Sequence, residues 1–300
     1  MNKKYIFLVL TVSIISLFLV NVSVFALELE YHKVYKLQPG RSVEEIMQIQ
    51  NFNQYTKFAN DYESTGYVYL IEADGSRRQR TFLRKRIILG RPTDNIAYKD
   101  FISYTGPTSV KGLSILSWTY TKYDQDPDQW LWLPSLKKIR KVSVAQGDDS
   151  FMGSDFTTEE ITTRKFEDET YKLISEEKFK GYIAELDAKT YKQGADCYVV
   201  EAKPKRSLWY YSKRIVWIEK ETGGDIYQEV YDAEGRKFKI ILKLYDNMTV
   251  NGKEYPTQNL LECKDLRTDH KTVIEMKDIK YDQGLEERDF SEKVIERSKW

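Results

Sequence analysis

Apolar and polar residues alternate along much of the chain from Thr65 onward, with the period of two that places successive side chains on opposite faces of a strand. The segment 237–245 shows this most clearly. Its apolar side chains share one face and its lysines share the other: Phe238, Ile240, Leu242 and Leu244 against Lys237, Lys239 and Lys243. This alternation predicts an antiparallel sheet with one buried face and one face in water.

Short turn sequences separate the predicted strands. They occur at Asp74-Gly75, Gly90-Arg91-Pro92, Gly106-Pro107, Gly223-Gly224, Glu234-Gly235, Asn251-Gly252 and Thr268-Asp269. In the second half they delimit strands near 213–220, 225–232, 236–246, 256–266 and 270–281, a spacing typical of an up-and-down meander. The chain contains no repeat and no long linker. We therefore expect one domain, mainly β, built on one strongly curved antiparallel sheet.

Two segments break the alternation and predict helical elements on one face of the sheet. Ser42-Val43-Glu44-Glu45 has the spacing of a capping box. Apolar residues then return at helical spacing and predict an amphipathic helix that ends near residues 60–62: Val43, Ile46, Met47, Tyr55, Phe58, Ala59 and Tyr62. Thr157 and Glu160 have capping-box spacing too, which predicts a second, shorter helical start.

The first 26 residues form a pattern of their own. Lys3 and Lys4 precede an apolar run over residues 5–20, and Val24 and Ala26 stand at the positions that signal peptidase reads before a cut. The pattern predicts a signal peptide over residues 1–26, with 27–300 as the exported domain. An uncleaved anchor is the alternative, although the run falls just short of the roughly 20 apolar residues that span a bilayer.

Charge and cysteine content narrow the function classes. The chain has 47 basic and 46 acidic residues, so it lacks the basic footprint of a nucleic-acid-binding protein. Cys197 and Cys263 are an even pair in a chain predicted to be exported, and they either form a disulfide or remain as two buried free thiols. Their spacing does not match the short cysteine pairs of zinc or thioredoxin-like sites.

The sequence carries none of the common catalytic motifs. The two histidines, His32 near the exported N-terminus and His270 in a predicted turn, are poorly placed for a nucleophile–histidine pair. The sequence contains no metalloprotease motif, nucleophile elbow or phosphate-binding glycine loop. The acidic pairs 44–45, 159–160 and 286–287 are interpreted as solvated helix positions. We therefore expect no enzyme activity, no cofactor and no metal.

The most unusual stretch lies in the middle of the chain. A Trp-rich strand, Gln129-Trp130-Leu131-Trp132-Leu133, leads through Pro134 into the basic segment 137–141, and Ser150-Phe151-Met152-Gly153-Ser154-Asp155-Phe156-Thr157 follows. Phe151, Met152 and Phe156 together would form an apolar patch that requires a partner.

These residues resemble the outer-membrane lipoprotein-sorting proteins, a LolA-like family of periplasmic carriers. The family signature joins a Trp-rich strand, Pro-x-Leu-Lys-Lys-x-Arg and Phe-Met-Gly-Ser-Asp-Phe, and both parts stand here in that order. Pro107 to Gly112 with Trp118 look like the family's strand entry. The chain departs from the pattern at Thr158-Glu159-Glu160, where an aromatic residue followed by an acidic pair is expected.

The resemblance implies an incomplete β-barrel whose concave, apolar face is covered by helices and houses acyl chains during passage through the periplasm. It also implies transient membrane contact and a role beside an inner-membrane exporter. The candidate lipid contacts are Ile46, Met47, Trp118, Trp130, Trp132, Phe151, Met152 and Phe156. Each could instead be ordinary core, because alternation fixes relative faces but not which face encloses a cavity.

A basic face is a second candidate surface. Lys137, Lys138, Arg140 and Lys141 either meet lipid headgroups or an acidic partner, or form a solvated strand face. Two other functions remain open for the same fold. One is a lipid-responsive sensor or accessory subunit that regulates a membrane partner, and the other is a scaffold whose interior is filled by its own side chains.

Overall fold

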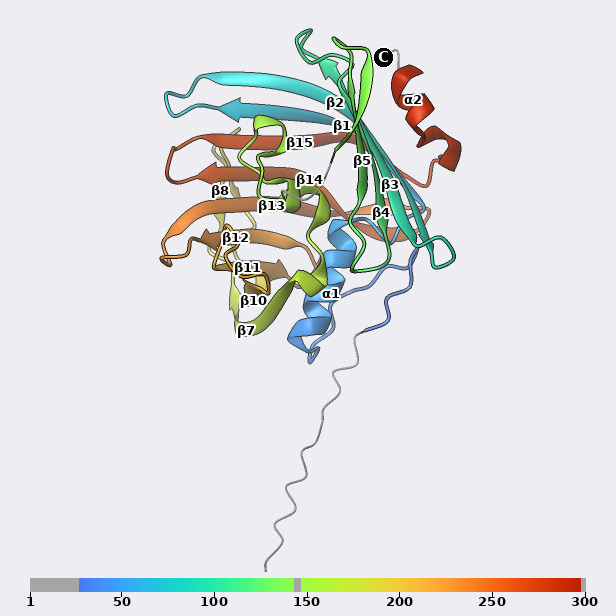
Figure 1. Ribbon diagram of the computed structural model, residues 1–300. Coiled ribbons are helices and arrows are strands. Elements are labelled where there is room, and N and C mark those ends of the chain that lie inside the picture. Colours follow the sequence, from blue (N-terminus) through green and yellow to red (C-terminus); the bar gives the residue numbers. More distant parts are fainter. Residues whose placement is uncertain (1–26, 143–146, 298–300) are drawn as a thin grey trace, which may run out of the picture.

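The computed structural model describes residues 27–142 and 147–297, so the predicted signal peptide lies outside the described residues. One antiparallel sheet of thirteen strands curves through the molecule (Figure 1). Its first half consists of β1 (Asp61–Ile71), β2 (Arg77–Arg91), β3 (Ile96–Gly106), β4 (Ser114–Tyr120), β5 (Asp128–Leu133) and β6 (Lys138–Val142). Its second half consists of β7 (Glu169–Lys178), β10 (Asp196–Pro204), β11 (Lys213–Glu219), β12 (Asp225–Tyr231), β13 (Lys237–Val250), β14 (Lys253–Asp265) and β15 (Lys271–Tyr281).

Two meanders make this sheet, and the first and last strands of the fold join them at its centre. β1 pairs with β15, with Val68 opposite Ile274 and Leu70 opposite Thr272. The strand order runs from β6 at one edge to β7 at the other, so the sheet is open and is not closed into a barrel. The predicted meander and the curved, open antiparallel fold are confirmed.

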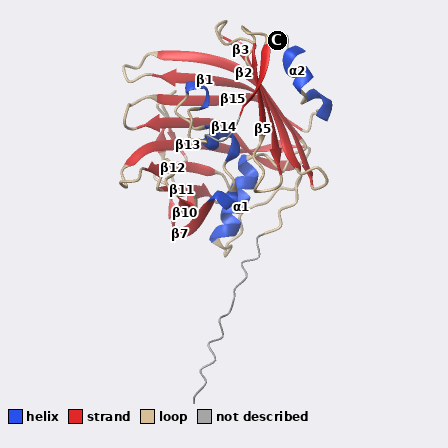
Figure 2. Cartoon of the chain, viewed as in Figure 1, coloured by secondary structure: helices blue, strands red, loops and turns tan. Residues whose placement is uncertain are grey.

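Helix α1 (Val43–Gln54) begins at the predicted capping box. The Glu45 amide donates to Ser42 Oγ at 3.2 Å, and the Ser42 amide donates to the Glu45 carboxylate at 2.9 Å. Ile46 and Met47 pack on strands β10 and β11, so α1 lies against the inner face of the second meander (Figures 1 and 2).

The predicted end of this helix near residues 60–62 is wrong. The helix ends at Gln54 because Thr56 takes a positive φ of 54°, which a right-handed helix does not allow. Phe58 and Ala59 lie in the following turns and Tyr62 lies on β1. All three are buried in one core cluster with Tyr281. Their spacing in the sequence looks helical because the turn and the first residues of β1 direct these side chains into the same core.

A segment between β6 and β7 covers the inner, concave face. We call residues 147–168 the covering segment; it contains the short helical turns η1 (Phe151–Gly153), η2 (Glu159–Thr163) and η3 (Phe166–Asp168). The predicted helical start is confirmed, since the Glu160 amide donates to Thr157 Oγ1 and the Thr157 amide donates to the Glu160 carboxylate.

The outer, convex face has covers of its own. A small hairpin, β8 (Tyr182–Ile183) with β9 (Thr190–Tyr191), places Tyr182, Ala184 and Tyr191 over Leu242 and Leu244. The C-terminal segment, with η4 (Glu287–Asp289) and α2 (Glu292–Arg297), lies beside β3, β4 and β5 on the other side of the sheet from α1 (Figure 1). No helix within the described part of the chain is both long and apolar enough to cross a membrane.

The prediction that the lysine face of β13 is in water is therefore wrong. Lys239 and Lys243 are 4% and 3% exposed, and both lie on the concave face. Lys239 lies beneath the covering segment, and Lys243 lines the cavity. Each is buried together with a carboxylate, and each ion pair removes the cost of an isolated charge. Both faces of β13 are covered, which alternation alone does not reveal.

Candidate functional site

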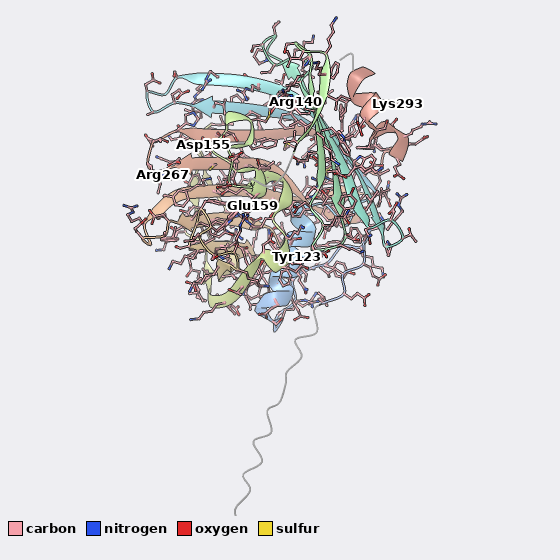
Figure 3. All side chains as sticks on the ribbon, viewed as in Figure 1. Tyr123, Arg140, Asp155, Glu159, Arg267 and Lys293 are labelled. Carbon is pink, nitrogen blue, oxygen red and sulfur yellow. The ribbon has the colours of Figure 1, made fainter. Side chains whose placement is uncertain are left out.

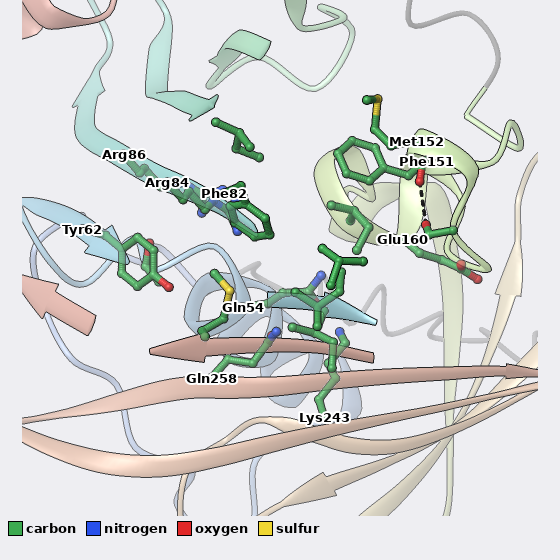
Figure 4. Close-up of a pocket in the computed structure, with 18 of the residues that line it drawn as sticks. Gln54, Tyr62, Phe82, Arg84, Arg86, Phe151, Met152, Glu160, Lys243 and Gln258 are labelled. Atoms are coloured by element: carbon green, nitrogen blue, oxygen red, sulfur yellow. Dashed lines mark hydrogen bonds between the residues drawn. The ribbon is translucent and has the colours of Figure 1, made fainter. Parts of the chain in front are cut away.

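A cavity lies between the concave face and the covering segment. It holds about 1010 Å³ of space free of atoms, part of it open to solvent. The apolar wall comes from strands of both meanders: Val68, Leu70, Phe82, Ile102, Leu261, Ile274 and Met276. Figure 4 shows Phe151 and Met152 on the covering segment and Phe82, Arg84 and Arg86 on a strand across from them.

Gly66 shapes the wall beneath Phe82. A Cβ at this position would lie 2.0 Å from the Phe82 ring, so the ring occupies the place that any side chain would take. Gly66 stands opposite Phe82 in the β1–β2 register. The glycine therefore lets the aromatic ring lie flat against the sheet instead of standing upright in the cavity.

The covering segment is held at its cavity end by polar contacts. Arg80 Nη1 donates to the Met152 carbonyl at 2.7 Å. Thr272 Oγ1 donates to the Asp155 carboxylate at 2.7 Å, and His270 Nδ1 lies 2.7 Å from the same oxygen (Figure 3 labels Asp155). Phe151 and Met152 are consequently fixed over the cavity while the backbone around them is tied to the sheet.

A buried ion pair ties the next part of the covering segment to the sheet, and a second one lies within the segment. Lys239 Nζ lies 3.0 Å from the Glu160 carboxylate, and Arg164 Nε lies 2.7 Å from Glu159. Burial opposes ionisation of Glu160, but Lys239 and Arg164 keep the pKa of this carboxyl below its usual value. The prediction that Glu159 and Glu160 are solvated is wrong, because both are less than 10% exposed. The partner of Glu160, Lys239, lies 79 residues further along the chain, so the sequence alone could not show this pair.

The inner face of β2 carries a basic cluster at one end of the cavity. Arg84 and Arg86 both bind Asp100 of β3, with nitrogen–oxygen distances of 2.6 and 2.5 Å. Burial alone would raise the pKa of the Asp100 carboxyl, but the two guanidinium groups lower it to about 2. Arg86 also donates to the Tyr55 carbonyl at 2.9 Å, which links this end of the cavity to the residue after α1.

A further cation reaches the cavity from β13. Lys243 Nζ lies 2.6 Å from the Asp225 carboxylate, and both side chains are almost fully buried. Burial lowers the pKa of Lys243 although Asp225 opposes the shift. The positive charge of Lys243 is therefore balanced by the carboxylate of Asp225.

The structure brings only some of the predicted lipid contacts to the cavity. Phe151 and Met152 line it, and Phe156 lies behind them, 1% exposed in the main core cluster. Ile46 and Met47 are buried between α1 and strands β10 and β11, so they do not line it.

The predicted placement of the three tryptophans in the cavity is wrong. Trp118, Trp130 and Trp132 lie on the convex face, in a cluster with Phe290 and Ile295 of the C-terminal segment. Trp118 Nε1 donates to the Phe290 carbonyl at 3.0 Å, and its ring centroid is 5.0 Å from that of Trp130. The concave positions of these strands are taken by their alternate neighbours Ile115, Ser117, Gln129 and Leu131.

The basic face is a solvated edge of the sheet. Lys138, Arg140 and Lys141 lie on β6, and Lys137 lies in the turn before it; all four are exposed (Figure 3 labels Arg140). Lys141 Nζ pairs with Asp128 at 2.6 Å. None of the four lines the cavity, so headgroup or partner contact by this edge stays a prediction.

The two cysteines are free, which corrects the disulfide alternative. Cys197 lies on β10 and Cys263 on β14, both buried, with three strands between them. Four strand spacings correspond to roughly 19 Å, whereas a disulfide requires Cα atoms within about 7 Å. The alternative of two buried free thiols is the one that the structure supports.

Within residues 27–142 and 147–297, no group of three or more His, Cys, Asp or Glu side chains lies close enough to hold a metal ion. His32 Nδ1 lies 3.0 Å from the Ala59 carbonyl, and His270 contacts Asp155. Both histidines thus make contacts that position loops.

Sequence reasoning missed the arginines of β2. Arg80, Arg84 and Arg86 are separated by even numbers of residues in the run Arg-Thr-Phe-Leu-Arg-Lys-Arg, so they share a face with Phe82. That signal was present in the sequence. The sequence could not show that this face lines the cavity, because the curvature of the whole sheet decides which face becomes concave.

Comparison with known proteins places the chain among relatives of the same fold. A family model described as "Uncharacterized protein" matches residues 97–297, about two thirds of the chain, so the chain belongs to that family. Among curated proteins, none matches the sequence significantly.

Solved structures confirm the predicted LolA-like fold. A domain from Vibrio parahaemolyticus that is named for outer membrane lipoprotein sorting is 24% identical, with a TM-score of 0.68 over 85% of this chain and 98% of that chain. A DUF1329 family protein from Desulfovibrio piger is 23% identical, with a TM-score of 0.68 over 84% and 98%. A LolA superfamily protein from Nitrosomonas europaea is 17% identical, with a TM-score of 0.56 over 85% and 99%. At these identities the likeness concerns the fold.

Proposed function

We propose that this protein is a non-enzymatic periplasmic carrier that binds lipid, or the acyl chains of a lipoprotein, in the concave cavity and moves them across the envelope. The observation that carries the proposal is the cavity itself, which has an apolar wall on the sheet and Phe151 and Met152 on its cover. The apolar wall and the cover face each other across this space, so an acyl chain bound there contacts apolar side chains on both sides.

Physical chemistry makes such binding tight and reversible. Each buried methylene contributes about 0.8 kcal/mol, so a chain of some fifteen methylenes gains on the order of 10 kcal/mol before the entropy of association is subtracted. No covalent step is needed for capture or release. That property suits a protein that accepts its cargo at one membrane and delivers it to another.

The names of similar proteins point the same way. Lipoprotein sorting appears in the name of the Vibrio domain, and its fold extends over most of the present chain. The pattern of residues 1–26 supports export to the periplasm, and N-terminal sequencing of the exported protein tests it by locating the cut before Leu27. An inner-membrane exporter as donor remains part of this proposal.

Vesicle-to-vesicle transfer tests the carrier function. Purified protein is loaded from donor vesicles that contain a fluorescent phospholipid or a diacylated peptide, and the label is followed into acceptor vesicles. We expect transfer to rise in proportion to protein concentration. Lipid binding without transfer would favour a lipid-responsive sensor, and absence of both binding and transfer would favour a filled scaffold; either result contradicts the carrier proposal.

A further inference from the structure

We propose that the ligand of the cavity is an acidic amphiphile whose anionic group is held on the inner face of β2 between Arg80 and Arg84, with Arg86 adding to the positive charge there. This inference rests on the proposed function and specifies its ligand class. All three arginines line the cavity from one strand, β2, and Phe82 lies among them on the same face. Alternate residues of a strand are about 6.8 Å apart, so Arg80 and Arg84 lie on either side of Phe82 with their Cα atoms roughly 14 Å apart, and Arg86 lies one alternate position further along.

The charges at this end do not balance. Arg84 and Arg86 share the single carboxylate of Asp100. Arg80 donates to the Met152 carbonyl, and among the described residues no carboxylate lies within ion-pair distance of it. Three guanidinium groups thus face one carboxylate, which leaves an excess of positive charge.

In the other half of the concave face, the buried positive and negative charges balance. Lys239 pairs with Glu160, Lys243 pairs with Asp225, and Arg214 pairs with Glu169 at 2.6 Å. Each buried cation there has its own carboxylate. The excess charge is therefore a local property of β2, and the cost of holding it in a partly closed cavity is removed when an anion enters.

The surroundings of the arginines specify the rest of the ligand. Val68, Leu70 and Met276 line the same cavity, so an anion bound at β2 that carries an apolar chain can bury that chain beside it. Guanidinium groups bind carboxylate and phosphate oxygens in a planar, two-bond geometry. A fatty acid or a phospholipid has this combination of groups, whereas the diacylglyceryl cysteine of a lipoprotein carries no acidic group next to its chains.

Matched fluorescent probes test the inference on the wild-type protein. A polyene fatty acid and its methyl ester share the same chain and differ in charge. We expect the acid to bind about 10-fold or more tightly than the ester, with an advantage that shrinks as salt increases. Equal affinities would overturn the inference and leave the proposed function standing, and failure of both probes to bind would overturn both.

Substitutions on β2 locate the effect. R80Q and R84Q each lower the affinity for the acid about 10-fold and leave the affinity for the ester unchanged. Arg77→Gln is the matched control, because Arg77 is exposed on the opposite face of the same strand. If the variants unfold, the comparison of acid and ester on the wild-type protein still tests the inference.

Binding of inorganic phosphate alone distinguishes a site for a free anion from a site for an amphiphile. Tight binding of phosphate, which has no apolar chain, would contradict the proposal.

Discussion

Lys239 Nζ lies 3.0 Å from Glu160 Oε2, with both side chains less than 5% exposed, and this pair joins β13 to the covering segment. Lys239→Met leaves Glu160 buried without its cation, and we expect a loss of about 3–5 kcal/mol in the free energy of unfolding. Urea denaturation measures the loss. Lys237→Met is the control, since Lys237 pairs with Glu229 at the surface and its replacement costs less than about 1 kcal/mol.

The double variant Lys239→Met with Glu160→Gln tests whether the unpaired charge causes the loss. We expect it to recover a large part of the stability, because no isolated charge then remains in the interior. A double variant as unstable as the single one would show that the methionine itself, and not the orphaned carboxylate, disturbs the packing.

Acid should destabilise the protein through two buried carboxyl groups. Burial alone would raise the pKa of Asp100 and of Glu169, but their arginine partners lower both to about 2. The ordinary pKa values are 3.8 and 4.5, so the stabilisation is fully present above pH 5 and is lost as the pH falls toward 2. We expect each group to contribute about 2–3 kcal/mol to this loss. Urea unfolding at a series of pH values measures it; a free energy that stays constant from pH 5 to pH 3 would contradict the account.

The thiols should be unreactive until the protein unfolds. Burial raises the pKa of Cys197 to about 12, and it raises the pKa of Cys263 well above the usual range. A buried, protonated thiol is a poor nucleophile. Iodoacetamide followed by mass measurement should label neither cysteine in native protein and both in urea. Protein isolated without reductant that takes up no label in urea would instead contain the disulfide.

The C-terminal segment should protect the tryptophans without affecting the cavity. Phe290 is 1% exposed and packs in the cluster of Trp118 and Trp130, while Glu287 pairs with Lys99 at 2.7 Å nearby. Phe290→Ala removes the central contact, so we expect tryptophan emission to shift to longer wavelength and lipid retention to stay unchanged. Glu292→Ala, an exposed change on α2, should shift neither. Loss of lipid in the Phe290 variant would contradict the separation of the two faces.

Local signals predicted the elements of this fold well. The turns at Asp74-Gly75 and Asn251-Gly252 lie between the strands that they were expected to join, and Ser42 with Glu45 starts α1. These features depend on a few neighbouring residues. The end of α1 depended on more distant contacts, because Phe58 and Tyr62 reach the same core from a turn and a strand.

The cavity was harder to predict because alternation is symmetric between the two faces of a sheet. Trp130 and Leu131 point to opposite faces whatever the curvature, and nothing local says which face becomes concave. The lysines of β13 were misassigned for a related reason. Their carboxylate partners, Glu160 and Asp225, come from other parts of the chain, and only the folded structure brings them together.

Native mass spectrometry of the purified protein tests the central claim most directly. Val68 and Tyr69 are neighbours on β1, and only Val68 lines the cavity. We expect the wild type and Tyr69→Trp to retain lipid of defined mass and stoichiometry, and Val68→Trp, which fills the cavity, to lose at least about 90% of it while remaining folded by circular dichroism. Equal retention by Val68→Trp and Tyr69→Trp, or an absence of lipid from the wild type even after exposure to vesicles, would contradict the claim that the concave face encloses a ligand.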